Sequence, residues 1–192
     1  MRRHDRVRRF VGDGSGVSGV EFALLAPVLI AVFVGMVELT RAYGTSQRAS
    51  RATRAMADLI SRNSPSSDTV SIIYQGGRSM LAPFDASKAE IVLTAVGVYL
   101  QKDGSFKAKV CSSVTSLGTQ YPAGTDLGAP PPSETRDKGR YVMAEMKLKY
   151  APIIDVFPVL KNFSFEKKVT WPVRSATAKE IVLPNGAACP SS

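Results

Sequence analysis

The chain has 192 residues, of which 44% are hydrophobic and 21% are charged, and its formal net charge is +9. This charge does not indicate nucleic-acid binding, because the basic residues form no stripe with aromatic residues and no zinc-finger or helix-turn-helix pattern is present. The single histidine, His4, and the lack of a CxxC pair argue against a His/Cys metal site. We therefore expect no metal, no cofactor, no nucleic-acid partner and no small-molecule substrate.

Enzymatic catalysis is not expected either. The sequence contains no G-x-S-x-G elbow, no Walker-type phosphate loop and no dinucleotide fingerprint. Its aspartates are scattered among turn and cap positions, where this residue is common for structural reasons. We therefore assign no catalytic residue and expect a non-enzymatic protein.

The N-terminal part consists of a basic leader followed by an apolar run. Residues 1–16 are basic and then glycine-rich, so we expect them to be disordered. The run from Val17 to Val37 covers about 31 Å as a helix, which is enough to cross the hydrocarbon core of a membrane. It contains one carboxylate, Glu21, and a proline, Pro27, at which we expect a kink. No A-x-A-like site follows the run, so conventional signal-peptide cleavage is not expected.

The flanking charges and the cysteines bear on the orientation of this span. Five arginines precede it, and four follow it, namely Arg41, Arg48, Arg51 and Arg54. The positive-inside rule therefore favours a cytoplasmic N-terminus by a small margin. Cys111 and Cys189 form either one disulfide, which would suit an exported domain, or two separate thiols. We expect a single-pass protein of the inner (cytoplasmic) membrane whose C-terminal region is periplasmic or extracellular.

The helix is expected to continue from Arg41 to about Arg62, where Asn63-Ser64-Pro65 ends it. Small residues recur along this part at helical spacing and predict a seam that packs on the rest of the domain. One row of the seam is Ala42, Ala49 and Met56, and its companion row is Thr45, Ala52 and Leu59. The arginines lie off the seam and are interpreted as a solvated face.

The remaining sequence predicts one short helix and then strands. The helix runs from Ser67 or Asp68 to Leu81 and is stopped by Pro83. A long surface loop is expected over residues 115–138, which include three consecutive prolines. The expected strands are Ala89–Leu100, Phe106–Val114, Tyr141–Tyr150 and Phe163–Arg174. These elements predict an α+β fold in which a long N-terminal helix packs on a small antiparallel sheet of about four strands. We divide the chain into a leader (1–16), a transmembrane and assembly helix (17–40) and an exported α+β domain (41–192).

A motif lies where the leader meets the apolar run. A glycine, Gly16, is followed after four residues by Glu21 and Phe22. This arrangement resembles the prepilin peptidase site of type IV pilins and pseudopilins. The resemblance implies cleavage after Gly16, which makes Val17 the new first residue. It also implies that Glu21 pairs with the free amino terminus of a neighbouring subunit, which would offset the cost of an isolated carboxylate in an apolar environment.

The likeness extends along the apolar run. Residues 20–24 read VEFAL, and Pro27, Gly35 and Glu38 follow. This stretch is similar to the N-terminal signature of TadE/TadG-like pseudopilins of the tight-adherence (Flp, type IVb) pilus systems. The resemblance implies a minor pseudopilin that works with prepilin peptidase, other pilins or pseudopilins and the pilus assembly platform. Two alternatives stay open at this point: a permanently anchored adhesion or envelope-binding module that keeps its leader, and a soluble secreted binding protein.

Overall fold

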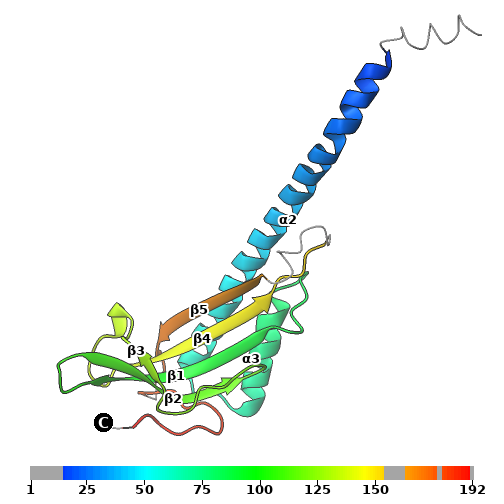
Figure 1. Cartoon of the computed structure of the whole chain (residues 1–192). Helices are drawn as coiled ribbons and strands as arrows, with labels where there is room; N and C mark the ends of the chain where they lie inside the picture. Colours follow the sequence, from blue (N-terminus) through cyan, green and yellow to red (C-terminus); the bar gives the residue numbers. More distant parts are fainter. Residues whose placement is uncertain (1–14, 154–162, 177–178, 191–192) are drawn as a thin grey trace, which may run out of the picture. The chain divides into compact units, whose positions relative to one another are not determined.

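The computed structural model describes residues 15–153, 163–176 and 179–190. These residues fall into two compact units, one ending at Ala42 and the other beginning at Tyr43. The elements, shown in Figure 1, are α2 (Ser15–Arg62), α3 (Ser67–Ser79), β1 (Glu90–Leu100), β2 (Phe106–Thr115), β3 (Asp126–Gly128), a 3-10 turn η1 (Pro132–Glu134), β4 (Arg140–Lys149) and β5 (Ser164–Pro172). The structure thus confirms an α+β fold with a long N-terminal helix.

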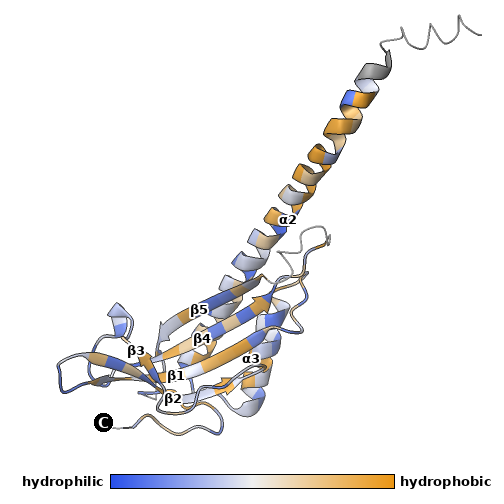
Figure 2. Ribbon diagram, in the orientation of Figure 1, coloured by the Kyte–Doolittle hydropathy of each residue, from blue (hydrophilic) through white to orange (hydrophobic). Residues whose placement is uncertain are grey.

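The helix α2 differs from expectation at its start. It begins at Ser15, so Gly16 is helical, whereas the predicted disordered leader extended through Gly16; residues 1–14 of that leader lie outside the described part. The helix includes Pro27, as expected, and the kink expected there stays a prediction. A proline in an apolar helix removes one backbone hydrogen bond, and neighbouring backbone groups can adjust to that loss. Figure 2 shows that the N-terminal part of α2 is strongly apolar and that polar residues become frequent further along it.

The second unit contains an antiparallel sheet with the strand order β3-β2-β1-β4-β5. The four predicted strands correspond to β1, β2, β4 and β5, with ends shifted by up to two residues. The fifth strand, β3, and the turn η1 lie within residues 115–138, where only a loop was expected. The strand β3 has just three residues and pairs with β2 near Ala108 and Lys109, so no alternating pattern could have revealed it.

One face of the sheet forms the main core with the second half of α2. The alternating side chains predicted for β4 do lie in this core, together with residues of β1 and the tail, namely Ile91, Leu93, Ala95, Val142, Ala144, Met146, Leu148, Ile181 and Leu183. The contributions of α2 are Ala49, Ala52, Met56, Ala57 and Ile60. Small alanines allow a helix to approach a sheet closely, which confirms the predicted packing of a small-residue seam.

The prediction that Leu59 belongs to the packing seam is wrong. Its side chain is 50% exposed, and the buried positions next to it are Ala57 and Ile60. The seam was extrapolated with a seven-residue repeat, but a straight α-helix drifts by about 20° per heptad relative to that repeat. The predicted solvated face is confirmed, because Arg48, Arg51 and Arg54 are all exposed. Arg48 also donates a 2.7 Å hydrogen bond to the carbonyl of Ala82.

The opposite face of the sheet carries a smaller core. Val96, Val98, Ala108, Tyr141 and Met143 are buried there. Three partly buried residues, Phe106, Tyr121 and Leu127, pack against them. Two of these come from the segment that was expected to be a simple surface loop. The segment therefore covers part of this face, and Tyr121 reaches as far as Glu145. Beyond it, Glu145 pairs with Lys168 and Lys147 pairs with Glu166.

The short helix α3 begins as predicted and ends two residues earlier than predicted. The side chain of Ser66 accepts a hydrogen bond from the backbone N–H of Thr69 and caps the helix. Four of its residues, Val70, Ile73, Tyr74 and Gly77, are buried at helical spacing. The helix packs closely on α2 at Gly77, since an added Cβ at this position would overlap the sulfur of Met56 on α2.

The adjacent glycines of α3 give a matched test of this packing. Gly77→Ala is expected to lower the free energy of unfolding by about 1–3 kcal/mol, since Met56 is 1% exposed and has little room to move. Gly76→Ala should instead raise it by up to about 1 kcal/mol, because nothing lies within 4 Å of an added Cβ there and alanine favours the helix. Urea denaturation followed by circular dichroism measures both. Equal effects of the two substitutions would contradict the close approach at Gly77.

Candidate assembly helix

The part of α2 in the first unit exposes nearly all of its apolar side chains. Among those at least half exposed are Val20, Phe22, Leu24, Leu25, Val28, Leu29, Ile30, Val32, Phe33, Met36 and Leu39. Such a continuous apolar surface is far larger than the patches that soluble monomers leave in water. Of the described helices, α2 alone is long and apolar enough to cross a membrane. A lipid environment or other helices of the same kind would cover this surface.

Glu21 interrupts the apolar surface near its start. Its side chain is exposed, as is that of the adjacent Phe22. The positions one helical turn further on, Leu24 and Leu25, are exposed apolar residues as well. A carboxylate in this setting, if placed in a membrane, requires a cationic partner or contact with water. Glu21 is thus placed to meet a group from outside its own helix.

The predicted processing site lies in the first turn of α2. Gly16 and Val17 directly follow Ser15, where the helix begins. The first four backbone N–H groups of any helix have no partner within it, so this turn is the part that unwinds most easily. Glu21 is four positions after Val17 in the helix, which places the two about 6 Å apart along the axis.

The second carboxylate of the helix has a different environment. Glu38 is only 3% exposed and takes part in polar interactions within the folded chain. Buried carboxylates are tolerated when they are paired or hydrogen-bonded. The two carboxylates therefore differ: Glu38 is buried and interacts with other groups of the chain, whereas the side chain of Glu21 is exposed.

The two cysteines are joined by a disulfide between Cys111 and Cys189, and their Cα atoms are 4.7 Å apart. The register of β1 with β2 shifts between Ala95 and Val96, which leaves Cys111 as the extra residue of a bulge in β2. The hydroxyl of Tyr99 lies 4.0 Å from the sulfur of Cys111 and donates a 3.0 Å hydrogen bond to the carbonyl of Pro190. The bulge and Tyr99 together hold the C-terminal tail against the sheet.

No group of three His, Cys, Asp or Glu side chains in the described ranges is arranged to hold a metal ion. The ionisable groups with the largest upward shifts are buried tyrosines. Burial and the nearby carboxylate of Glu134 raise the pKa of Tyr141 to about 12, and burial raises the pKa of Tyr74 further. Both groups stay neutral at physiological pH, which gives them packing roles.

Sequence reasoning missed one cluster of charged residues. Arg136, Lys138 and Arg140 approach and begin β4, and Lys179 of the tail joins them around a cavity. These three residues alternate over five positions of the sequence, and this local pattern could have indicated a basic surface. The contribution of Lys179 could not be found in this way, because it lies about forty residues further along the chain.

The helix α2, which could span a membrane, continues into a small α+β unit. Residues 16–58 match the family model described as TadE-like protein, so this segment is TadE-like, as the resemblance predicted. The match begins at Gly16, covers the whole apolar surface and extends to Asp58 in the second unit. Comparisons with curated proteins and with solved structures gave no match. The family match indicates a role in the assembly of tight-adherence pili, with other pilus components as partners.

Proposed function

We propose that this protein is a minor pseudopilin that is cleaved after Gly16 by prepilin peptidase and then joins the assembly of tight-adherence pili. The observation that carries the proposal is the exposed carboxylate of Glu21, five residues past Gly16. It lies in an apolar helix segment that the rest of the described structure does not bury. The start of the TadE-like match at Gly16 supports the same boundary. The free amino group of Val17 in one subunit would then pair with Glu21 of another.

The proposed topology places the N-terminus in the cytoplasm and the second unit outside the membrane. The disulfide between Cys111 and Cys189 supports this orientation, because disulfides persist in the periplasm and the extracellular space but are rare in the cytosol. The arginines that precede the apolar run point in the same direction. In this arrangement the inner membrane holds the residues around 17–37 until they are transferred to a pilus or its base.

Processing is tested by replacing the residue before the proposed cut. Gly16→Phe should leave nearly all of the protein at its unprocessed length in cells that express the peptidase, because a bulky side chain cannot replace hydrogen in the protease cleft. N-terminal sequencing of wild-type protein from the membrane should start at Val17. The matched control is Gly35→Phe, which lies on the same helix where an added Cβ meets nothing within 4 Å, and its processing should be normal.

The same experiment discriminates between the proposed function and the other readings. A wild-type N-terminus at Met1, together with stable anchoring and normal piliation of the Gly16→Phe strain, would contradict the pseudopilin and support a permanently anchored module. Release of wild-type protein into the aqueous fraction would support a soluble secreted protein instead.

A further inference from the structure

The cavity missed by sequence reasoning lies at one end of the second unit. It measures about 460 Å³ and is lined by the segment before β4 and the segment after β5, including Val173, Ser175 and Ala176. The backbone N–H of Arg174 donates a 2.8 Å hydrogen bond to the carbonyl of Ser61, so the segment after β5 lies against the C-terminal end of α2. This end of α2 is about 27 Å along the helix from Tyr43, where the unit begins.

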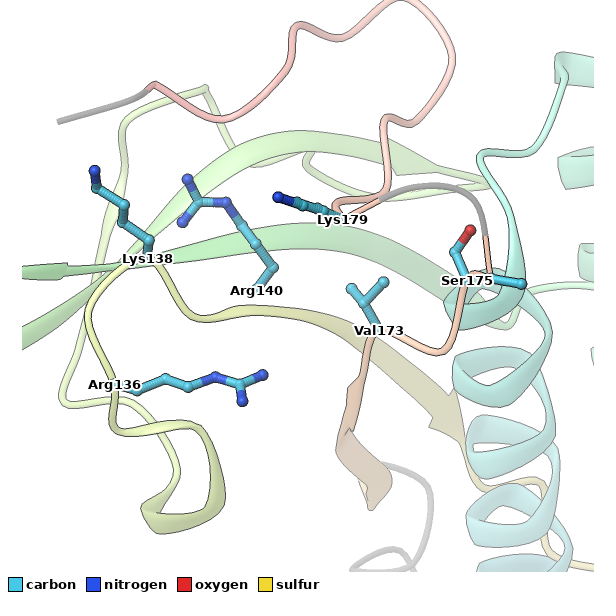
Figure 3. Close-up of a pocket in the computed structure, with 7 residues that line it drawn as sticks. Arg136, Lys138, Arg140, Val173, Ser175 and Lys179 are labelled. Carbon is cyan, nitrogen blue, oxygen red and sulfur yellow. The ribbon is translucent and has the colours of Figure 1, made fainter.

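Four cationic side chains line the cavity, and two carboxylates lie beside it. Arg136 is 3.8 Å from Glu134, and the Nε of Arg140 is 3.4 Å from Glu180. Lys138 and Lys179 make no ion pair with any residue of the described ranges. Figure 3 shows the guanidinium of Arg140 between these two lysines, with Arg136 extending separately from the preceding loop. The cavity therefore carries an excess of positive charge concentrated at its lysines.

A second cavity, of about 630 Å³, shares Lys138 with the first and is also lined by Lys109 and Asp137. Tyr99 lines the second cavity, and its ring centroid is 5.3 Å from the guanidinium of Arg140 and 6.0 Å from the ammonium of Lys109. We call these five basic residues, Lys109, Arg136, Lys138, Arg140 and Lys179, the cation track. Its extent over two cavities suits a polymer with repeated negative charges better than a single small anion.

We propose that the cation track binds the oxyanion groups of an acidic polysaccharide outside the membrane. Arginine and lysine are the side chains that recognise carboxylate, sulfate and phosphate oxygens. The apolar lining of the first cavity is limited to the small side chains of Val173 and Ala176. The second cavity adds Leu100, Val110 and Pro190 beside Tyr99, so the cations alternate with modest apolar surface along the track. A polyhydroxylated, charged chain is the ligand class that this lining fits.

One alternative occupant fits the structure less well. A second copy of this chain carries the same net charge of +9, and Glu145 and Glu166 on its exposed sheet face are already paired with Lys168 and Lys147.

Binding is tested with the full chain in nanodiscs of neutral phosphatidylcholine, with a heparin-derived oligosaccharide as the probe and dextran as the uncharged control. The double substitution Lys138→Gln, Lys179→Gln should weaken heparin binding about tenfold and reduce its dependence on salt, because two oxyanion contacts are lost. These lysines have no ion-pair partners among the described residues, so folding should persist, and the circular dichroism spectrum verifies this.

The matched control removes the same charge elsewhere, in Lys88→Gln, Lys102→Gln, two exposed lysines that line neither cavity. This control should bind heparin within about twofold of the wild type. An equal loss in both double variants would overturn the proposal in favour of general electrostatic attraction. Binding of phosphatidylglycerol vesicles that depends on Lys138 and Lys179, without binding of heparin, would overturn it in favour of a lipid surface. The assay needs no pili, so its result is independent of whether pseudopilin assembly is verified.

Discussion

Replacing Glu21 by glutamine should abolish pilus assembly while membrane insertion and cleavage after Gly16 continue. Glutamine has nearly the same shape but no charge, so it cannot form an ion pair with the amino terminus of Val17 on a neighbouring subunit. In an apolar environment, removing one partner of such an ion pair costs about 3–5 kcal/mol of stability, because the other charge is left uncompensated. Removal of the carboxylate also makes the isolated helix easier to insert, since a lone acidic residue opposes insertion.

The measurement has three parts in one strain. Alkaline extraction reports membrane insertion, N-terminal sequencing reports cleavage, and electron microscopy with immunoblotting of sheared material reports assembly. Glu21→Asp keeps the charge on a shorter side chain and should retain partial assembly. If the Glu21→Gln strain makes as many pili as the wild type, the proposed role of the carboxylate is contradicted.

Glu38→Gln serves as the matched control on the same helix. Glu38 is 3% exposed and already has polar interactions in the folded chain, so its substitution should reduce the amount of stable protein. The protein that remains should still be cleaved and assembled. A loss of assembly with normal protein levels in both variants would indicate that any carboxylate on this helix is needed, and the distinction between the outward-facing and the buried residue would fail.

The features that could be predicted from the sequence depend on local patterns. The apolar run next to Gly16 and Glu21 predicted the long apolar helix, because the length of the run and its isolated carboxylate are local features of the sequence. The strand β4 alternates, so its side chains that face α2 were also predictable. The helix–sheet packing followed from the small residues at Ala49 and Ala52.

The features that could not be predicted depend on contacts between distant segments. The strand β3 forms because β2 offers it an edge, and its own three residues carry no pattern. Gly77 has no local signal that explains a glycine within α3, whereas the closeness of Met56 gives that glycine a packing function. The cation track combines Lys109, Arg140 and Lys179 from three separated segments. Such juxtapositions follow from topology, which local periodicity does not encode.

Removal of the disulfide is the other change expected to have a large effect. The bond between Cys111 and Cys189 closes a loop with a sequence separation of 78 residues. In the chain-entropy model a loop of this size stabilises the fold by about 4.5 kcal/mol through restriction of the unfolded chain. The double substitution Cys111→Ala, Cys189→Ala should therefore lower the free energy of unfolding by about 2–5 kcal/mol, a large part of the stability of a small domain.

The loss should begin in the tail and extend into the core. Ile181 and Leu183 of the tail are buried against the sheet, and the backbone N–H of Leu183 donates a 3.1 Å hydrogen bond to Ser112, next to Cys111. Gly186 lies so close to Ser112 that a Cβ there would overlap its side chain. Without the covalent link, these contacts alone must hold the tail against its conformational entropy.

Urea denaturation of the oxidised wild type, the reduced wild type and the double variant separates the contribution of the bond from that of the substitutions. The reduced wild type and the double variant should unfold at similar urea concentrations, both well below the oxidised protein. Limited proteolysis should cut the tail of both before the sheet, since Cys111 remains within β2 whereas residues 179–190 lose their covalent attachment. If all three unfold at the same urea concentration, the contacts of Ile181, Leu183 and Gly186 suffice without the bond. The disulfide would then report the oxidising compartment of the domain without contributing to its stability.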